Sequence, residues 1–239
     1  MAPGEAGGFV ARADGCSCLG YVKPTNRSPD NHPRAANEKI VSDLARAVGI
    51  CVPPVQLYRR DKNTEGHETR ACVSMVMYPQ FHEWERIVQL GDAAVALARS
   101  ALARACGIIA FDAYVGNTDR ANARNSLFGS DPASPIDDQF VFVDFANSLL
   151  HHNHWTTSLA TKHVVVPNMF DAIKACAHGP TLSQTIQAIE ELTDETIDGI
   201  LARIPEDYMS SPQRELVREG LKVRRALVRP VLATQFNLN

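Results

Sequence analysis

The sequence changes its periodicity at Pro79. Before this proline, most segments have the alternating or continuously apolar pattern of β-strands, whereas almost all of the chain after it has the spacing of helices. A chain of 239 residues is long enough for one large domain or two small ones, each with its own core. We therefore predict an α+β fold of two lobes, with a β-rich N-terminal lobe over residues 1–78 and a mainly helical C-terminal lobe over residues 79–239.

The N-terminal lobe is predicted to begin with a β-hairpin. Residues 9–13 alternate, Asp14 and Gly15 are a typical hairpin turn, and residues 19–23 form the returning strand. A helix is predicted over residues 34–48, because apolar side chains recur there at helical spacing and a glycine follows.

Two further extended segments, residues 52–58 and 71–78, complete this lobe. In the C-terminal lobe we expect only two short strands, at residues 125–128 and 139–143. The C-terminal segment, residues 213–232, is predicted to be an amphipathic helix with six Arg or Lys against two Glu. Such a basic face is usually solvated, and a surface for an acidic partner is the alternative.

Charge and hydropathy exclude several classes of protein. The chain has 24 Lys and Arg against 27 Asp and Glu, a net charge of −3, which argues against a nucleic-acid-binding protein. The most apolar stretch, residues 93–115, contains Arg99, Arg104 and Asp112, so we expect a buried helix and no membrane span. The six cysteines are scattered, and the N-terminus lacks the pattern of a signal peptide, which favours reduced thiols and a cytoplasmic location.

Four charged residues, far apart in the chain, have the chemistry that phosphoryl transfer needs. Lys23 ends a predicted strand, Glu38 lies in the first turns of the next helix, Asp119 follows a buried helix, and Asp144 follows an apolar strand. A lysine can hold phosphates, and a helix carboxylate can hold that lysine. Carboxylate and amide oxygens suit Mg²⁺, and a further aspartate can orient and deprotonate an acceptor hydroxyl.

The order and spacing of these segments resemble the HipA-like kinases, and especially their short members, which have the protein-kinase-like and phosphatidylinositol-kinase-like fold. The resemblance covers roughly residues 7 to 230. It rests on the motifs Tyr21-Val22-Lys23, Ala36-Asn37-Glu38, Phe111-Asp112-Ala113, Asn117-Thr118-Asp119-Arg120, Val143-Asp144-Phe145 and Ile204-Pro205-Glu206-Asp207-Tyr208.

The resemblance implies a role for each charged residue. Lys23 would contact the α- and β-phosphates of ATP, and Glu38 would pair with this lysine. Asp119 would be the catalytic base, and Asp144 would bind Mg²⁺ with Asn125 as the second ligand. A binding site for ATP and Mg²⁺ is therefore implied between the two lobes.

The resemblance also assigns the ends of the nucleotide site. Met75, Met77 and Tyr78 would belong to the hinge, whose backbone meets adenine. Gly7 and Gly8 would be the remainder of the loop that covers the phosphates, since glycine lets backbone amides approach anions.

Three departures from the kinase pattern leave alternatives open, and the first is that the Gly-rich segment at residues 4–8 is short. The asparagine that binds metal in protein kinases stands five residues after the catalytic aspartate. Here Asn122 is three residues and Asn125 six residues after Asp119, so either could be the ligand. The motif at Asp144 ends in Ala146, where kinases have the more permissive glycine.

The function that the resemblance implies is an ATP- and Mg²⁺-dependent kinase that phosphorylates a Ser or Thr hydroxyl, with a protein as the expected substrate and a toxin-like role. One alternative is a nucleotide-binding pseudokinase that acts as an interaction module. The other is a kinase of a small molecule or a lipid headgroup. Arg120 is expected to orient a nearby carboxylate.

Overall fold

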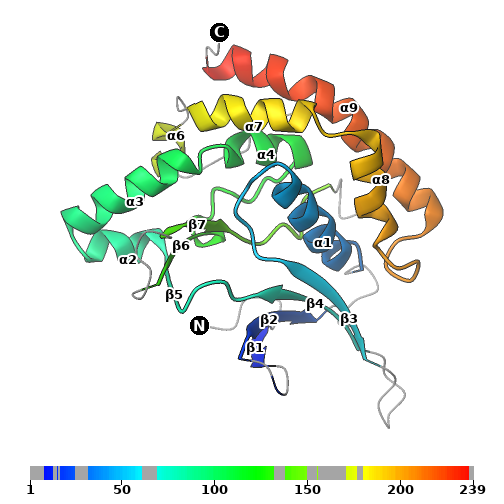
Figure 1. The fold of residues 1–239 in the computed structure, drawn as a ribbon, viewed down its shortest axis with the longest axis horizontal. Helices are drawn as coiled ribbons and strands as arrows, with labels where there is room; N and C mark the ends of the chain where they lie inside the picture. Colours follow the sequence, from blue (N-terminus) through cyan, green and yellow to red (C-terminus); the bar gives the residue numbers. More distant parts are fainter. Residues whose placement is uncertain are drawn as a thin grey trace.

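The chain forms two antiparallel β-sheets and a group of helices, as the computed structural model in Figure 1 shows. The described residues are 8–12, 15, 17–24, 32–60, 69–131, 138–149, 155, 171–176 and 180–236. The N-terminal part is a small sheet with one helix, and the larger C-terminal part is mainly helical. The predicted α+β fold class is confirmed.

The first sheet contains the first four strands in the order β1-β2-β4-β3. These strands are β1 (Phe9–Arg12), β2 (Leu19–Pro24), β3 (Val55–Arg60) and β4 (Thr69–Met75). The predicted hairpin is present, with Phe9 opposite Val22. Strand β2 also pairs with β4, which brings Lys23 opposite the buried Cys72 in the middle of the sheet.

Helix α1 (His32–Ala47) connects β2 to β3 and packs on the sheet, against β3 and β4. The predicted helix at residues 34–48 agrees with it within two residues at each end. Its apolar side chains Ile40, Val41 and Leu44 are completely buried. The helix stops before Gly49, whose φ of 78° lies in the left-handed region that favours glycine. Helix α8 (Asp194–Ala202) packs against α1 from the C-terminal part.

The second sheet has the strand order β5-β6-β7, with β5 (Gln80–His82), β6 (Ser126–Ser130) and β7 (Gln139–Phe142). Strands β6 and β7 were expected, but β5 was not, because three residues are too few to have a recognisable pattern. In the described part of the chain, no strand before residue 78 pairs with one after it. The lobe boundary itself stays a prediction.

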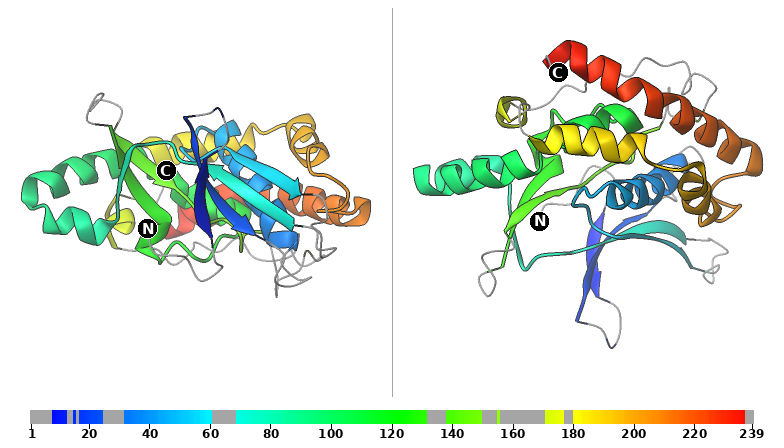
Figure 2. Two further views of the ribbon diagram at one scale, coloured as in Figure 1. Left: turned by 90° about the horizontal axis from the view of Figure 1, so that it is seen from below. Right: turned by 45° about the horizontal axis from the view of Figure 1, so that its top comes forward.

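The remaining helices form layers above the second sheet (Figures 1 and 2). They are α2 (Trp84–Gln89), α3 (Asp92–Arg104), α4 (Ile108–Val115), α6 (Asp171–Ala175), α7 (Pro180–Glu190) and α9 (Ser211–Phe236). Helix α4 is buried along its whole length and contacts both α7 and α9. It is therefore the centre of the C-terminal core.

The buried helix expected over residues 93–115 is two helices in the structure. Helices α3 and α4 meet at a bend of 55°, and only α4 is completely buried. Among the described helices, none is long and apolar enough by itself to cross a membrane, and α3 with α4 reaches that length and composition only as a bent pair.

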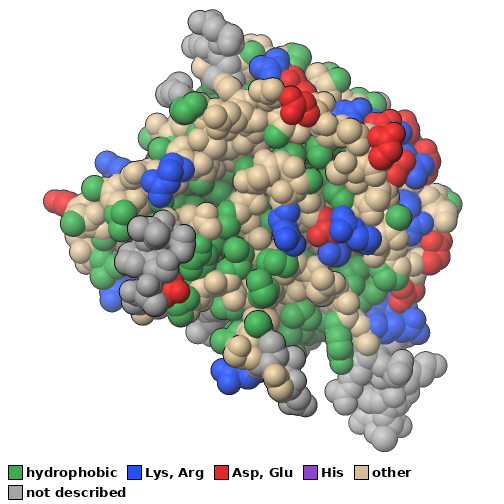
Figure 3. Space-filling view, viewed as in Figure 1, with side chains coloured by type: hydrophobic (Ala, Val, Ile, Leu, Met, Phe, Trp, Pro, Cys, Tyr) green, Lys and Arg blue, Asp and Glu red, His purple; other side chains and the backbone are tan. Residues whose placement is uncertain are grey.

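Four basic side chains of α9 lie beside acidic side chains of α7 and α8, so that positive and negative charges are mixed along this edge of the molecule (Figure 3). The pairs are Arg218–Asp198 at 2.6 Å, Lys222–Asp194 at 3.2 Å, Arg225–Asp194 at 3.0 Å and Arg229–Glu190 at 2.6 Å. These contacts neutralise much of the basic face within the chain itself. An acidic partner for this helix stays a prediction.

Candidate active site

Three of the charged residues singled out in the sequence meet at the ammonium group of Lys23. Its Nζ lies 2.5 Å from Oε1 of Glu38 and 2.8 Å from Oδ1 of Asp144. Lys23 comes from the end of β2, Glu38 from α1, and Asp144 from the segment after β7. The expected Lys23–Glu38 ion pair is therefore present, and it includes a third residue that lies 121 positions from the lysine.

Glu38 uses both carboxylate oxygens. Oε1 accepts from Lys23, and Oε2 accepts from the backbone N–H of Phe145 at 3.1 Å. Burial raises the pKa of the Glu38 carboxyl, and the Lys23 ammonium and the Phe145 N–H oppose this increase by stabilising the carboxylate. Glu38 thus joins the N-terminal sheet, helix α1 and the segment after β7.

The pKa values of Lys23 and Asp144 shift in opposite directions. Burial by itself lowers the pKa of Lys23, but the negative charges of Glu38 and Asp144 outweigh burial and raise it. For Asp144, burial favours a higher pKa, but the attraction of Lys23 outweighs burial and the pKa is lowered. Both groups are therefore charged at neutral pH.

Asp144 has an unusual backbone conformation. Its φ is 62°, in the left-handed region that few non-glycine residues adopt, although aspartate tolerates it better than most. The next residue, Phe145, is buried and packs edge-on against Phe111 of α4, with ring centroids 6.0 Å apart. The Asp144 side chain remains 42% exposed beside Lys23, so its carboxylate is accessible to a cation.

Asn37, next to Glu38, holds the backbone after Asp144. Its Nδ2 donates to the carbonyl oxygens of Ala146 at 3.2 Å and Ser148 at 2.5 Å. Its Oδ1 accepts from Nε1 of Trp155 at 2.8 Å. The sequence motif contained this residue, but no role was predicted for it.

A buried ion pair lies below the loop that carries Asp119. Arg120 Nε donates to Asp112 Oδ2 at 2.7 Å and Nη2 donates to Oδ1 at 3.2 Å, and both side chains are completely buried. Asn117 Nδ2 also donates to Asp112, at 2.8 Å. The prediction that Arg120 orients a carboxylate is confirmed, and that carboxylate is Asp112. A charged residue in the otherwise apolar α4 was the signal that could have identified this carboxylate, because a buried charge needs a partner.

Arg120 also connects the two aspartate-bearing segments. Its Nη1 donates to the carbonyl oxygens of Asn125 and, at 3.4 Å, of Val143. Its guanidinium lies over the ring of Phe145, 5.0 Å from the centroid. The loop with Asp119 and the segment with Asp144 are therefore attached to one buried cation.

The side chain of Asn125 faces Asp119. Its Nδ2 donates to Oδ2 of Asp119 at 2.9 Å and to the Asp119 carbonyl at 3.1 Å. The Asn125 carbonyl accepts from the N–H of Val143 at 3.1 Å, so Asn125 links Asp119 to the residue before Asp144. Asn122 is exposed, and its Oδ1 accepts from the N–H of Arg124 at 3.2 Å, which caps the short helix η2 (Ala123–Asn125). Of the two candidate asparagines, Asn125 is the one joined to the site.

Of the predicted hinge residues, Met75 is the last residue of β4, and Met77 and Tyr78 lie between β4 and β5. The N–H of Met75 donates to Pro54 O at 3.0 Å, and that of Val76 donates to Leu19 O at 2.8 Å. The Tyr78 hydroxyl accepts from Gln139 Nε2 at 2.7 Å. The segment is thus attached to the N-terminal sheet at one end and to β7 at the other.

Of the two predicted phosphate-loop glycines, Gly7 lies outside the described residues. Gly8 is buried, and a Cβ at this position would lie too close to the hydroxyl of Tyr21. A side chain would therefore collide with the aromatic ring of the neighbouring strand. This close approach explains the glycine without reference to a ligand.

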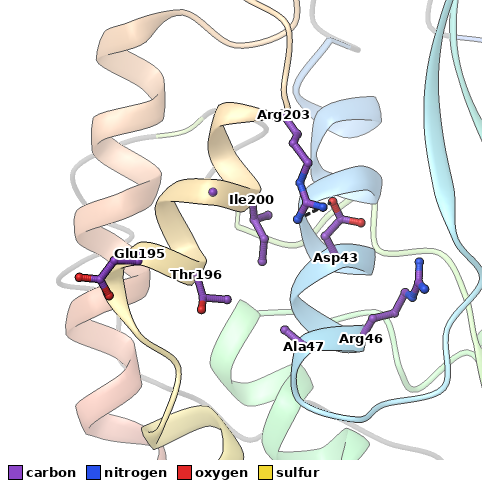
Figure 4. A pocket seen from close by; sticks show the side chains of 8 residues that line it. Asp43, Arg46, Ala47, Glu195, Thr196, Ile200 and Arg203 are labelled. Atoms are coloured by element: carbon purple, nitrogen blue, oxygen red, sulfur yellow. Dashed lines mark ion pairs between the residues drawn. The ribbon is translucent and has the colours of Figure 1, made fainter.

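A cavity of about 670 Å³ lies elsewhere, between α1 and α8 (Figure 4). Asp43, Arg46 and Arg203 are among its lining residues, and the guanidinium of Arg203 lies 3.4 Å from the Asp43 carboxylate. None of the predicted site residues lines it. The described residues also contain no group of three or more His, Cys, Asp or Glu arranged to hold a metal ion.

Comparisons with known proteins identify kinases. The profile of the HipA-like kinase family matches residues 14–235. Among solved structures, the chain is similar to the Helicobacter pylori proinflammatory kinase CtkA, with a TM-score of 0.61 and 14% identity, over 98% of this chain and 93% of that chain. At this identity the similarity shows a shared fold. No match was found among the curated proteins. Because the family profile spans nearly the whole sequence, this chain belongs to the HipA-like kinase family.

Proposed function

We propose that the chain transfers the γ-phosphoryl group of ATP to the hydroxyl of a Ser or Thr in a protein, in a Mg²⁺-dependent reaction. The contact of Lys23 with Glu38 at 2.5 Å and with Asp144 at 2.8 Å is the observation that carries this proposal. An ammonium group has three N–H donors, so the two carboxylates leave one for an α- or β-phosphate oxygen. Glu38 keeps the lysine in place for that contact.

The donor set fits Mg²⁺. Asp144 offers a partly exposed, ionised carboxylate. Asn125 uses its Nδ2 for Asp119, which leaves its amide Oδ1 as a hard oxygen ligand. Together these two residues would hold the ion, which when bound neutralises the charge on the phosphates.

Asp119 is proposed to orient the acceptor hydroxyl and accept its proton. Its Oδ2 accepts from Asn125, and its backbone N–H donates to Asn117 Oδ1 at 3.1 Å, so both the side chain and the backbone of Asp119 are held. Within the described residues, Oδ1 has no hydrogen-bond partner. This oxygen is therefore available to a substrate hydroxyl.

The hydrogen bonds within the hinge reduce the number of backbone groups that adenine could contact. The N–H groups of Met75 and Val76 already donate to carbonyl oxygens of the protein. The backbone of Met77 has no such contact with another described residue. We therefore assign adenine recognition to the backbone of Met77, between Val76 and Tyr78.

The first test is transfer of labelled phosphate from ATP by the purified protein with Mg²⁺ and a protein extract. Wild type should label a protein, and Lys23→Met should lose at least about tenfold in ATP affinity, because a charge-assisted hydrogen bond to phosphate is removed. ATP binding is measured by calorimetry. Lys39→Met is the matched control, because it also removes a largely buried lysine from a carboxylate, Asp43 at 3.0 Å, but outside the site.

The same assay separates the alternatives. Binding of ATP without any phosphoryl transfer would contradict this proposal and indicate a pseudokinase. Transfer that occurs with a protein-free metabolite or lipid extract, and not with proteins, would indicate a small-molecule or lipid kinase. A toxin-like role, which the family resemblance implies, requires that expression of wild type slows growth and that expression of Lys23→Met does not.

The two asparagines allow a second test. Asn125→Ala should raise the Mg²⁺ concentration needed for half-maximal transfer by at least about tenfold, because a ligand oxygen is lost. Asn122→Ala removes the cap of η2 and should cost about 1 kcal/mol of folding stability without this change in Mg²⁺ requirement. A Mg²⁺ titration of both variants is the measurement. A larger shift for Asn122→Ala than for Asn125→Ala would reverse the assignment.

A further inference from the structure

The last carbonyl groups of α4 are all hydrogen-bonded, although a helix leaves its final four carbonyls without partners inside the helix. Asp112 O accepts from the N–H of Asn117 at 2.9 Å, and Val115 O accepts from the N–H of Leu149 at 2.8 Å. The carbonyls of Ala113 and Tyr114 have a partner that is more than 100 residues away. That partner is Arg224 of α9.

Arg224 reaches from the outer helix into the core. Its Nε donates to Tyr114 O and its Nη2 donates to Ala113 O, both at 2.6 Å. Only 1% of the residue is exposed. A cation is favourable at this place, because the C-terminus of a helix has a partial negative charge. Burial lowers the pKa of Arg224, to about 10, so the side chain is still charged at neutral pH.

The guanidinium also lies against the turn where the chain leaves α4. Gly116 follows the helix with a φ of 68°, and a Cβ at this residue would lie 3.4 Å from Nη2 of Arg224. Asp119 comes three residues later. The start of the Asp119 loop is therefore held by Arg224 from one side and, through Val115 O, by Leu149 from the other.

Arg224 differs from the other basic residues of α9. Lys222 and Arg229 pair with acidic side chains near the surface, and Arg225 donates to Leu192 O and to Asp194. None of these three has a hydrogen bond or ion pair with α4 among the described residues. An amphipathic basic helix thus has one arginine on the inner side, where it donates to backbone carbonyls of α4.

We propose that Arg224 is a positioning residue for phosphoryl transfer, which fixes the end of α4 and thereby the place of Asp119. This inference rests on the proposed kinase function. It does not involve the Lys23, Glu38 and Asp144 contacts, which lie in other elements. Loss of Arg224 should therefore affect the catalytic step and leave ATP binding nearly unchanged.

The test is steady-state kinetics of Arg224→Met and Arg224→Lys at a temperature below the Tm of every variant. We expect kcat to fall about 10- to 100-fold in Arg224→Met, because small displacements of a catalytic group have effects of this size. The KM for ATP should stay within about twofold of wild type, since the phosphate contacts are retained. The kcat of Arg224→Lys should lie between those of wild type and Arg224→Met. Its ammonium group can bind one of the two carbonyls well, but it lacks the planar fork of the guanidinium.

Arg225→Met is the matched control, because it removes the adjacent arginine and its contacts with Leu192 and Asp194 but no hydrogen bond to α4. It should keep the wild-type kcat. Amide hydrogen exchange provides a second measurement, in which residues 116–119 should exchange faster in Arg224→Met than in Arg225→Met.

The outcomes are distinct. Unchanged exchange at residues 116–119 in Arg224→Met, or a kcat equal to that of Arg225→Met, would overturn the inference. So would a KM for ATP that rises in parallel with the fall in kcat. If Arg224→Met does not fold, Arg224→Lys decides by the same criteria. If wild type transfers no phosphate at all, the proposed function fails, and exchange at residues 116–119 still decides whether Arg224 holds the loop.

Discussion

Replacement of Asp119 by Asn is expected to lower the rate of phosphoryl transfer by about 10²- to 10⁴-fold, the usual contribution of a general base. Asparagine has nearly the same shape as aspartate, and its amide oxygen can still accept from Asn125. It cannot accept the proton of an acceptor hydroxyl. The measurement is initial-rate transfer of labelled phosphate at saturating ATP and Mg²⁺.

Two further measurements make the Asp119→Asn result specific. ATP affinity should stay within about twofold of wild type, because Lys23 and Asp144 are unchanged. Asp171→Asn, at a completely exposed aspartate of α6, is the control for the loss of one negative charge and should keep the wild-type rate. If Asp119→Asn retained the wild-type rate, Asp119 would not be the base and the proposed mechanism would be wrong.

Arg120→Met is expected to lower the free energy of unfolding by about 3–5 kcal/mol, because it leaves the buried carboxylate of Asp112 without its cation. Both side chains have no exposed surface, and their closest N–O distance is 2.7 Å. The same substitution also removes the donor to the carbonyls of Asn125 and Val143. Urea unfolding followed by circular dichroism measures the change.

A surface ion pair shows how much of this cost in unfolding free energy depends on burial. Arg229→Met breaks the exposed Arg229–Glu190 contact at 2.6 Å and should cost about 0–1 kcal/mol. The double variant Arg120→Met with Asp112→Leu should be less destabilised than Arg120→Met alone, since no unpaired charge remains. A cost below about 1 kcal/mol for Arg120→Met would show that Asp112 and Arg120 do not depend on each other.

The local parts of the fold were predictable from local patterns. Helix α1 could be located because its apolar residues recur at helical spacing and Gly49 follows it. The first hairpin was predicted because its turn residues lie between two alternating segments. By contrast, β5 and the bend between α3 and α4 were missed. A three-residue strand exists only because β6 lies beside it, and a break between two apolar helices does not change the apolar pattern.

The candidate site divides in a similar way. Lys23 and Glu38 were predicted to pair, because they belong to motifs whose order resembles a known family. The second contact of Lys23, with Asp144, was not predicted. Asn125 was preferred to Asn122 as the second metal ligand, but the spacing in the sequence left both open. Contacts of this kind depend on where segments of different elements come together in space, and the local spacing of residues in the sequence does not determine these places. The orientation of Asn125 toward Asp119 is such a case.

The sequence alone determined which chemical groups are available and which helix or strand carries most of them, because hydrophobic periodicity and turn residues act over short distances. Only the tertiary structure decided that one buried arginine, Arg120, joins the loops of Asp119 and Asp144, and that Arg224 from the C-terminal helix completes the end of α4. The reason is that a buried charge or carbonyl must find a partner wherever packing brings one, and that partner can lie anywhere in the chain.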